Sequence, residues 1–135
     1  MTESLIRQFH GPRPPIICLC GSTRFKTVFE QVASRETLAG KLVLTVNYFG
    51  NDDGQPAKAN LPQTSPQDKT RLNELHKRKI DLADEVLVLN VGGYIGHTTQ
   101  SEIDYARRTG KPVRFLEQRE PVAATAQQPR GGDRS

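Results

Sequence analysis

The chain of 135 residues contains no tryptophan, one methionine and only two cysteines, and aromatic residues make up 6% of it. The low cysteine count excludes a small fold held together by several disulfides. No apolar run is long enough to cross a bilayer, and the first residues lack the apolar core of a signal peptide. We therefore expect a soluble cytoplasmic protein with one packed core, because this length suits a single domain.

The two cysteines, Cys18 and Cys20, lie two residues apart in a short apolar run. On a strand they point to the same face, and extended backbone at that spacing does not let them form a disulfide. No second cluster of cysteine and histidine with zinc-binding spacing accompanies them. We interpret them as small buried apolar residues in a reduced compartment, and we expect neither a metal nor a cofactor.

The net charge of +4 raises the question of a nucleic-acid partner. Several of the arginines lie in the end segments, namely Arg7, Arg13, Arg119, Arg130 and Arg134. Elsewhere basic residues alternate with acidic ones, and no aromatic strand typical of RNA-binding domains is present. The charge favours a surface that attracts small anions, and it favours neither nucleic acid nor a membrane as a partner.

Apolar runs of strand length alternate with segments of helical periodicity along the middle of the chain. We predict strands at 16–20, 42–49, 85–91 and 113–116 and helices at 23–39, 68–83 and 99–109. This alternation predicts an α/β fold, a three-layer sandwich around a small parallel sheet of four or five strands, of the flavodoxin/Rossmann-like type. Residues 1–14 are predicted to be a flexible arm, 15–117 the domain and 118–135 a disordered tail.

In sheets of this kind, ligands bind beyond the carboxyl ends of the strands, at the point where the strand order switches. The predicted loops at that edge are 21–24, 47–67 and 92–99. The stretch 50–67 is long for an internal connection, which is typical of a functional lid or of disorder. These loops are also the segments with the most unusual composition.

The first loop, Gly21–Arg24, joins a strand to the start of a helix. Backbone N–H groups and the helix dipole favour an anion there, and the Ser22 and Thr23 hydroxyls and the Arg24 guanidinium suit a phosphate. The alternative is an ordinary capped helix with a surface arginine, since the motif is not a complete phosphate-binding loop.

The second loop contains Gly92, Gly93 and Gly96, which would let the backbone approach a ligand closely. Val91 stands where the dinucleotide fingerprint has its first glycine, so we reject a nicotinamide dinucleotide. Tyr94 suits either stacking on a base or an interface with a partner chain.

Glu102 follows this loop in the next predicted helix. The run Thr99–Glu102 fits a capping box, in which the glutamate would only satisfy the backbone of Thr99. A cap at Thr98 would leave the carboxylate free. The sequence leaves both alternatives open.

His76 lies on the inward stripe of the predicted helix 68–83, about midway from the ligand-binding edge. It is either a core histidine or a functional one. Asp81 and Asp84, near the far end of that helix, are interpreted as structural, and the basic run 77–79 as a solvated face.

Several of these segments occur together in one known family. The motifs are Cys-Gly-Ser-Thr-Arg at 20–24, Ala-Asp at 83–84, Glu-Ile-Asp-Tyr-Ala at 102–106 and Gly-Lys-Pro-Val at 110–113. With them the chain resembles, over about Ile16 to Leu116, the nucleoside 2-deoxyribosyltransferase-like superfamily, which includes the 2'-deoxynucleoside 5'-phosphate N-hydrolases. The run HKRKIDLADEVLVLNVGGYIG is also similar to a subgroup of short bacterial and phage proteins.

The resemblance implies an N-glycosidase that hydrolyses the bond between base and sugar in a (deoxy)nucleoside 5'-monophosphate. It implies Glu102 as the nucleophile, Ser22 and Arg24 as the phosphate anchors, and a homodimer or larger homo-oligomer. The candidate substrate-binding residues are Gly21, Ser22, Thr23, Arg24, Phe25, Asn47, Asn90, Gly92, Gly93, Tyr94, Gly96, Thr98 and Ser101.

The chain departs from the family pattern at two positions. His76 stands where the family usually has an aspartate, and Gly96 falls where the transferases carry a second loop carboxylate. His76 would then hydrogen-bond or protonate the leaving base as a second catalytic residue. Base transfer, and a nucleotide-binding or sensing module without catalysis, remain as alternatives.

Overall fold

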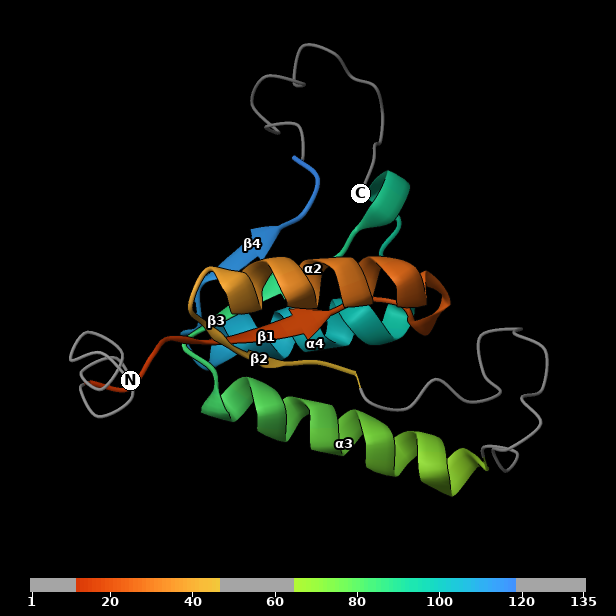
Figure 1. Ribbon diagram of the computed structural model, residues 1–135. Coiled ribbons are helices and arrows are strands. Elements are labelled where there is room, and N and C mark those ends of the chain that lie inside the picture. Colours follow the sequence, from red (N-terminus) through yellow and green to blue (C-terminus); the bar gives the residue numbers. More distant parts are fainter. Residues whose placement is uncertain (1–11, 47–64, 119–135) are drawn as a thin grey trace, which may run out of the picture.

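The structure is a computed structural model that describes residues 12–46 and 65–118 (Figure 1). The elements in order are β1 (Ile16–Cys20), the 3-10 helix η1 (Thr23–Phe25), α2 (Lys26–Leu38), β2 (Leu42–Leu44), α3 (Pro66–Leu82), β3 (Glu85–Val88), the 3-10 helix η2 (Val91–Gly93), α4 (His97–Arg108) and β4 (Val113–Phe115). The predicted arm up to residue 11, the long loop from Asn47 to residue 64 and the tail from residue 119 lie outside the described residues. None of the helices in the described parts is long and apolar enough to span a membrane.

The strands form one parallel sheet with the order β2-β1-β3-β4. Cys18 of β1 pairs with Leu44 of β2 on one side and with Val86 of β3 on the other. The chain runs outward from β1 to β2 and then returns to β3, so the strand order switches between β1 and β3. The loops after these two strands therefore leave the sheet side by side, where a ligand is expected in this type of fold.

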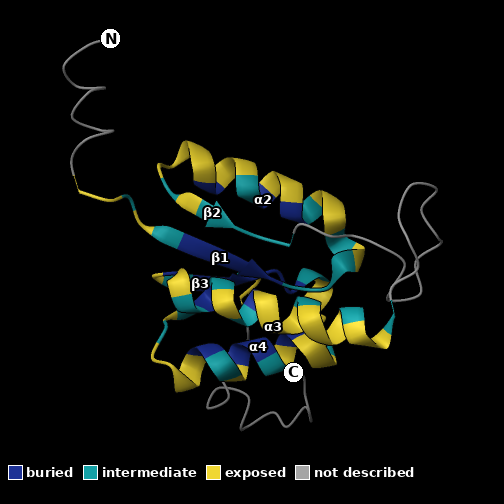
Figure 2. Ribbon diagram, turned by 90° about the horizontal axis from the view of Figure 1, so that it is seen from below, coloured by how far each residue is buried: buried dark blue, intermediate teal, exposed yellow. Residues whose placement is uncertain are grey.

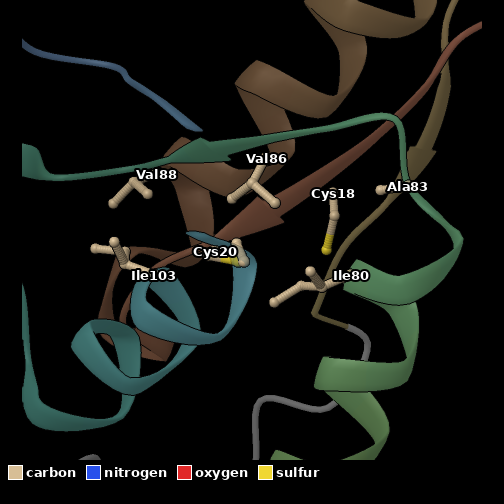
Figure 3. Close-up of a cluster of buried hydrophobic side chains, with 8 residues drawn as sticks. Cys18, Cys20, Ile80, Ala83, Val86, Val88 and Ile103 are labelled. Atoms are coloured by element: carbon tan, nitrogen blue, oxygen red, sulfur yellow. The ribbon is translucent and has the colours of Figure 1, made fainter. Parts of the chain in front are cut away.

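Helices cover both faces of the sheet, which confirms the predicted three-layer α/β sandwich. Figure 2 shows β1 buried along most of its length, between α2 on one side and α3 and α4 on the other. The face under α2 is packed with Ile17, Leu19, Phe29, Val32, Leu87 and Leu89. The opposite face is packed with Cys18, Cys20, Ile80, Ala83, Val86, Val88, Ile103 and Ala106 (Figure 3).

Several element boundaries differ from the predicted ones, among them the end of β2, which stops at Leu44 and not at residue 49. Two of the differences have clear local reasons. Helix α3 starts at Pro66 because Ser65 caps it: the Ser65 hydroxyl accepts from the Asp68 backbone N–H at 3.0 Å, and Asp68 accepts from the Ser65 N–H at 3.2 Å. Strand β3 ends at Val88 because the chain turns into η2 at Val91. Gly110 follows α4 with a φ of 81°, as its predicted role of helix stop requires.

Near the amino ends of β1 and β3, an ion pair and a hydrogen bond join the two strands. Asp84 accepts from the Ile16 N–H at 2.8 Å and pairs with Arg13 at 3.0 Å, which confirms its structural interpretation. The Arg13 hydrogen bond and then the Ile16 N–H hold the pKa of Asp84 at about 2. Asp81 accepts from the Tyr105 hydroxyl and so joins α3 to α4.

Candidate functional site

The two predicted ligand-binding loops meet at the carboxyl edge of the sheet. The Arg24 guanidinium lies 4.4 Å from the centre of the Tyr94 ring, within cation–π distance. Phe25 packs edge-on against the same ring, with centroids 6.0 Å apart and an interplanar angle of 75°. This contact follows from the strand order, because β1 and β3 are neighbours although their loops are about 70 residues apart in the sequence.

The first loop is a tight turn whose own hydroxyl caps it. The Ser22 hydroxyl accepts from the Arg24 backbone N–H at 3.2 Å, so the predicted helix begins as the 3-10 turn η1. Gly21 is required by close packing, because a Cβ there would lie 3.2 Å from the Leu89 Cβ and carbonyl oxygen. Thr23 is half-buried in the same turn.

Glu117, an exposed residue after β4, holds the glycine loop, a role that the sequence did not indicate. The Gly92 N–H donates to the Glu117 carboxylate at 3.0 Å, and Gly93, with a φ of 82°, donates its N–H to the Asn90 carbonyl at 2.8 Å. The Tyr94 N–H donates to the Val91 carbonyl at 3.0 Å. The backbone N–H groups of Gly92, Gly93 and Tyr94 are thus engaged within the protein.

Asn90 has a structural function in this arrangement. It is buried, its amide N–H donates to the Glu117 carbonyl at 3.1 Å, and its amide oxygen accepts from the Glu117 N–H at 2.9 Å. Both polar groups of the side chain therefore anchor the segment after β4. The predicted contact of Asn90 with a substrate has no support from this geometry.

Gly96 determines where Tyr94 lies. A Cβ at Gly96 would lie 3.0 Å from the Tyr94 hydroxyl oxygen, so a larger residue would push the ring away. Gly96 is also the N-cap residue of α4, in extended conformation. A side chain at residue 96 would therefore displace the end of the Tyr94 ring by a few tenths of an ångström.

Helix α4 begins at His97, so the capping box considered for Thr99–Glu102 does not form. Thr99 is buried inside the first turn, and Glu102 lies in the second turn, with its side chain directed into the protein. Only 6% of Glu102 is exposed. Its carboxylate is therefore free of a capping role.

His76 faces the sheet from α3 and lies beside Glu102. Its Nε2 is 3.1 Å from the Leu19 carbonyl oxygen and 4.0 Å from the Glu102 carboxylate. A carbonyl only accepts, so this contact places a proton on Nε2. Strand β2 pairs with β1 only as far as Cys18. The Leu19 carbonyl lies just beyond that pairing, and His76 is its hydrogen-bond donor.

The same nitrogen also faces both cysteines. Nε2 lies 3.4 Å from the Cys20 sulfur and 3.7 Å from the Cys18 sulfur. His76 is 56 residues away from Cys20 in the sequence, and no fixed motif spacing connects them. Among the described residues, these three are the group of donors that could hold a metal ion.

Burial and mutual contacts shift the protonation of this group. Burial raises the pKa of Glu102 by more than the neighbouring His76 lowers it. Burial acts to lower the pKa of His76, but the contacts with Cys18 and Glu102 outweigh it, so that this pKa is raised. The hydrogen bond from Cys20 lowers the pKa of Cys18 to about 6. Both the carboxyl of Glu102 and the imidazole of His76 thus hold their protons to higher pH than the isolated side chains would.

A cavity of about 170 Å³ lies between α3 and α4, and Glu102 forms part of its wall. The other lining residues are Asn73, Lys77, His97, Thr98 and Ser101. Thr98 and Ser101 were among the predicted substrate-binding residues, whereas Asn73 and Lys77 were not. Their spacing of four residues places them on one face of α3, but only the packing against α4 shows that this face borders Glu102.

Asn47 lies outside the described residues, so its predicted role stays a prediction. A comparison of the chain with protein-family models and with curated proteins gives no match.

Proposed function

We propose that this protein hydrolyses the N-glycosidic bond of a (deoxy)nucleoside 5'-monophosphate, with Glu102 as the nucleophile and His76 as its acid–base partner. The observation that carries the proposal is the position of Glu102. This buried carboxylate has no capping role, forms the wall of a polar cavity and lies 4.0 Å from a histidine. Its neighbour Cys20 directly precedes the loop proposed to bind phosphate.

The phosphate would lie at the first loop. Arg24 supplies a guanidinium that suits phosphate oxygens, and the stack on Tyr94 limits its freedom. The mildly basic surface supports the approach of an anion. The same contact gives Tyr94 and Phe25 a role in holding the arginine, whether or not they touch the nucleotide.

The cavity beside Glu102 would receive the base. Its volume of about 170 Å³ is below the roughly 300–1,000 Å³ of pockets that enclose whole drug-sized ligands, so it suits a fragment of a nucleotide. The Asn73 amide and the Ser101 hydroxyl can hydrogen-bond the edge of a base. With the base in this cavity, the bond between base and sugar would lie near the Glu102 carboxylate, which lines it.

The reaction would proceed in two steps. The Glu102 carboxylate attacks the anomeric carbon, the bond to the base nitrogen breaks, and His76 donates a proton to the departing base. The transition state resembles an oxocarbenium ion, which the carboxylate stabilises. Water then attacks the anomeric carbon of the glycosyl ester, His76 takes a proton from it, and Glu102 leaves as a carboxylate.

The main alternative is a nucleotide-binding module without catalysis. It is favoured by His76, which occupies the family's aspartate position and donates to the Leu19 carbonyl. A second alternative is base transfer, in which another base instead of water captures the glycosyl ester. A homodimer in which a partner residue completes the site remains part of the proposal taken from the family resemblance.

A screen of common nucleoside 5'-monophosphates, with release of free base and thermal shift measured on the same samples, tests the proposal. We expect base release from at least one nucleotide and a reduction of at least about 1,000-fold in Glu102→Gln, because the nucleophile is lost. Asp104→Asn, which removes an exposed carboxylate from the same helix, is the matched control and should retain the activity.

The possible outcomes separate the three functions. A thermal shift without base release, unchanged by Glu102→Gln, would establish the binding module. Faster turnover on addition of a second free base would establish the transferase. Neither a shift nor base release with any nucleotide would overturn the nucleotide proposal altogether.

A further inference from the structure

Cys18, Cys20 and His76 form a compact group of soft donors inside the protein. Both cysteines project from β1 toward the face covered by α3 and α4, where Figure 3 shows their sulfur atoms among Ile80 and Ile103. His76 approaches the two sulfurs from α3 with its Nε2. All three residues are buried, and both cysteines are free thiols.

The spacing of the three atoms matches that of ligands around a single metal ion. Nε2 is 3.4 Å and 3.7 Å from the two sulfurs, and all three atoms lie within 4.8 Å of one another. Tetrahedral zinc, with bonds of about 2.3 Å to sulfur and about 2.0 Å to nitrogen, separates these ligand atoms by about 3.6 Å. A point equidistant from the three atoms lies about 2.4 Å or less from each of them, which is close to a bond length.

We infer that Cys18, Cys20 and His76 bind one thiophilic divalent cation of the Zn²⁺ type. Thiolate and imidazole ligands select such ions over Mg²⁺ or Ca²⁺, which prefer oxygen. Glu102 lies next to this group, with its carboxylate 4.0 Å from Nε2. Glu102 also lines the cavity of about 170 Å³ between α3 and α4, so that cavity borders the neighbourhood of the three ligands.

Binding would exchange protons for the cation without any oxidation or reduction. Cys20, together with any Cys18 that is still protonated, releases its proton to solvent, and the two thiolates form two metal–sulfur bonds. The neutral imidazole moves its proton from Nε2 to Nδ1, and the hydrogen bond to the Leu19 carbonyl is given up. The loss of this hydrogen bond to Leu19 makes binding of the cation less favourable.

Metal binding does not depend on the proposed glycosidase activity. If the chain is a glycosidase, the cation occupies Nε2 of the proposed acid–base histidine and lies next to the proposed nucleophile Glu102. One equivalent of Zn²⁺ would then stop base release. Metal content and base release are measured separately, so failure of either proposal leaves the other intact.

The experiment uses the full chain, stripped of metal with a chelator and then titrated with Zn²⁺ and with Co²⁺. We expect one equivalent of each ion per chain, intense visible absorption from tetrahedral Co²⁺, and a sulfur-to-cobalt charge-transfer band in the near ultraviolet. The chain has only two cysteines, so that band reports Cys18 and Cys20 directly. Zn²⁺ should also protect both thiols from a thiol-reactive reagent.

Variants identify the ligands. Cys18→Ala and His76→Ala should each weaken Zn²⁺ binding by at least about 100-fold, since each removes a direct ligand. His97→Ala is the matched control, because His97 is exposed at the start of α4, and it should retain one equivalent. Should a variant fail to fold, the charge-transfer band and thiol protection of the unmodified chain still decide the question. Co²⁺ bound without a sulfur band, or Zn²⁺ that leaves both thiols reactive, would overturn the inference.

Discussion

The two faces of β1 carry different kinds of side chain although they come from the same five residues. Ile17 and Leu19 point toward α2 and join a wholly apolar cluster. Cys18 and Cys20 point toward α3 and α4, where they meet His76 and border Glu102. Alternation along one strand thus separates a wholly apolar face from a face on which buried polar groups lie within the apolar packing.

Burial has different physical effects on the two faces of β1. On the α2 side, burial removes apolar surface from water and stabilises the fold. On the other side, burial raises the pKa of Glu102 and places a histidine and two thiols in mutual contact. Ionised groups are unfavourable in such surroundings unless they are paired. This face is therefore expected to contribute less to the free energy of unfolding than the face under α2.

The strongest test of the contrast is a pair of neighbouring substitutions, Leu19→Ala and Cys20→Ala. Leu19→Ala should lower the free energy of unfolding by about 3 kcal/mol, because it opens a cavity under α2, whereas Cys20→Ala should lower it by about 1 kcal/mol.

Cys20→Ala also removes a hydrogen bond that lowers the pKa of Glu102, so the acid limb of activity should move to higher pH. Chemical denaturation and pH–rate profiles measure both effects, and equal losses of stability would contradict the division between faces.

His76→Gln should separate the proton-transfer role from packing. We expect base release to fall by about 100-fold, since general acid catalysis contributes roughly 10²–10⁴-fold. The unmodified protein should show a bell-shaped profile. Activity rises as Glu102 ionises, above its ordinary range because its pKa is raised, and falls as His76 loses its proton, at a pH above 6.5 because its pKa is also raised.

The glutamine variant should lose the basic limb and keep the acid limb, while its denaturation midpoint changes little. An unchanged basic limb in this variant would show that His76 does not titrate in the reaction.

Asp84→Asn tests a carboxylate whose pKa is lowered, whereas that of Glu102 is raised. Of the substitutions considered, it should change stability the least. The pKa of Asp84 is about 2 in the folded protein against an ordinary 3.8, so its stabilising contribution is complete above about pH 4 and is lost as the pH falls toward 2. The melting temperature of the variant should therefore lie below that of the unmodified protein at pH 6 and converge with it near pH 2. Asp104→Asn is the exposed control. A difference that persists at pH 2 would contradict the role of the Arg13 ion pair.

Much of the fold could be predicted because its signals are local. The period of the apolar residues placed β1 at residues 16–20, as observed, and the alternation of strands and helices predicted the parallel sheet with helices on both faces. The start of α4 could not be predicted reliably, since Thr98 and Thr99 both looked like good caps. Gly96 occupies the cap position instead, in extended conformation and without a side-chain hydrogen bond, so neither threonine signal marked the start of the helix.

The sequence by itself determined which chemical groups are present and that the loops after β1 and β3 share one edge of the sheet. Only the tertiary structure decided which groups meet. The contact of His76 with the cysteines and Glu102, and the hold of Glu117 on the glycine loop, depend on strand register and on the packing of α3 against α4. Such contacts join residues 25 to 58 positions apart, and no local pattern encodes distances of a few ångströms between them.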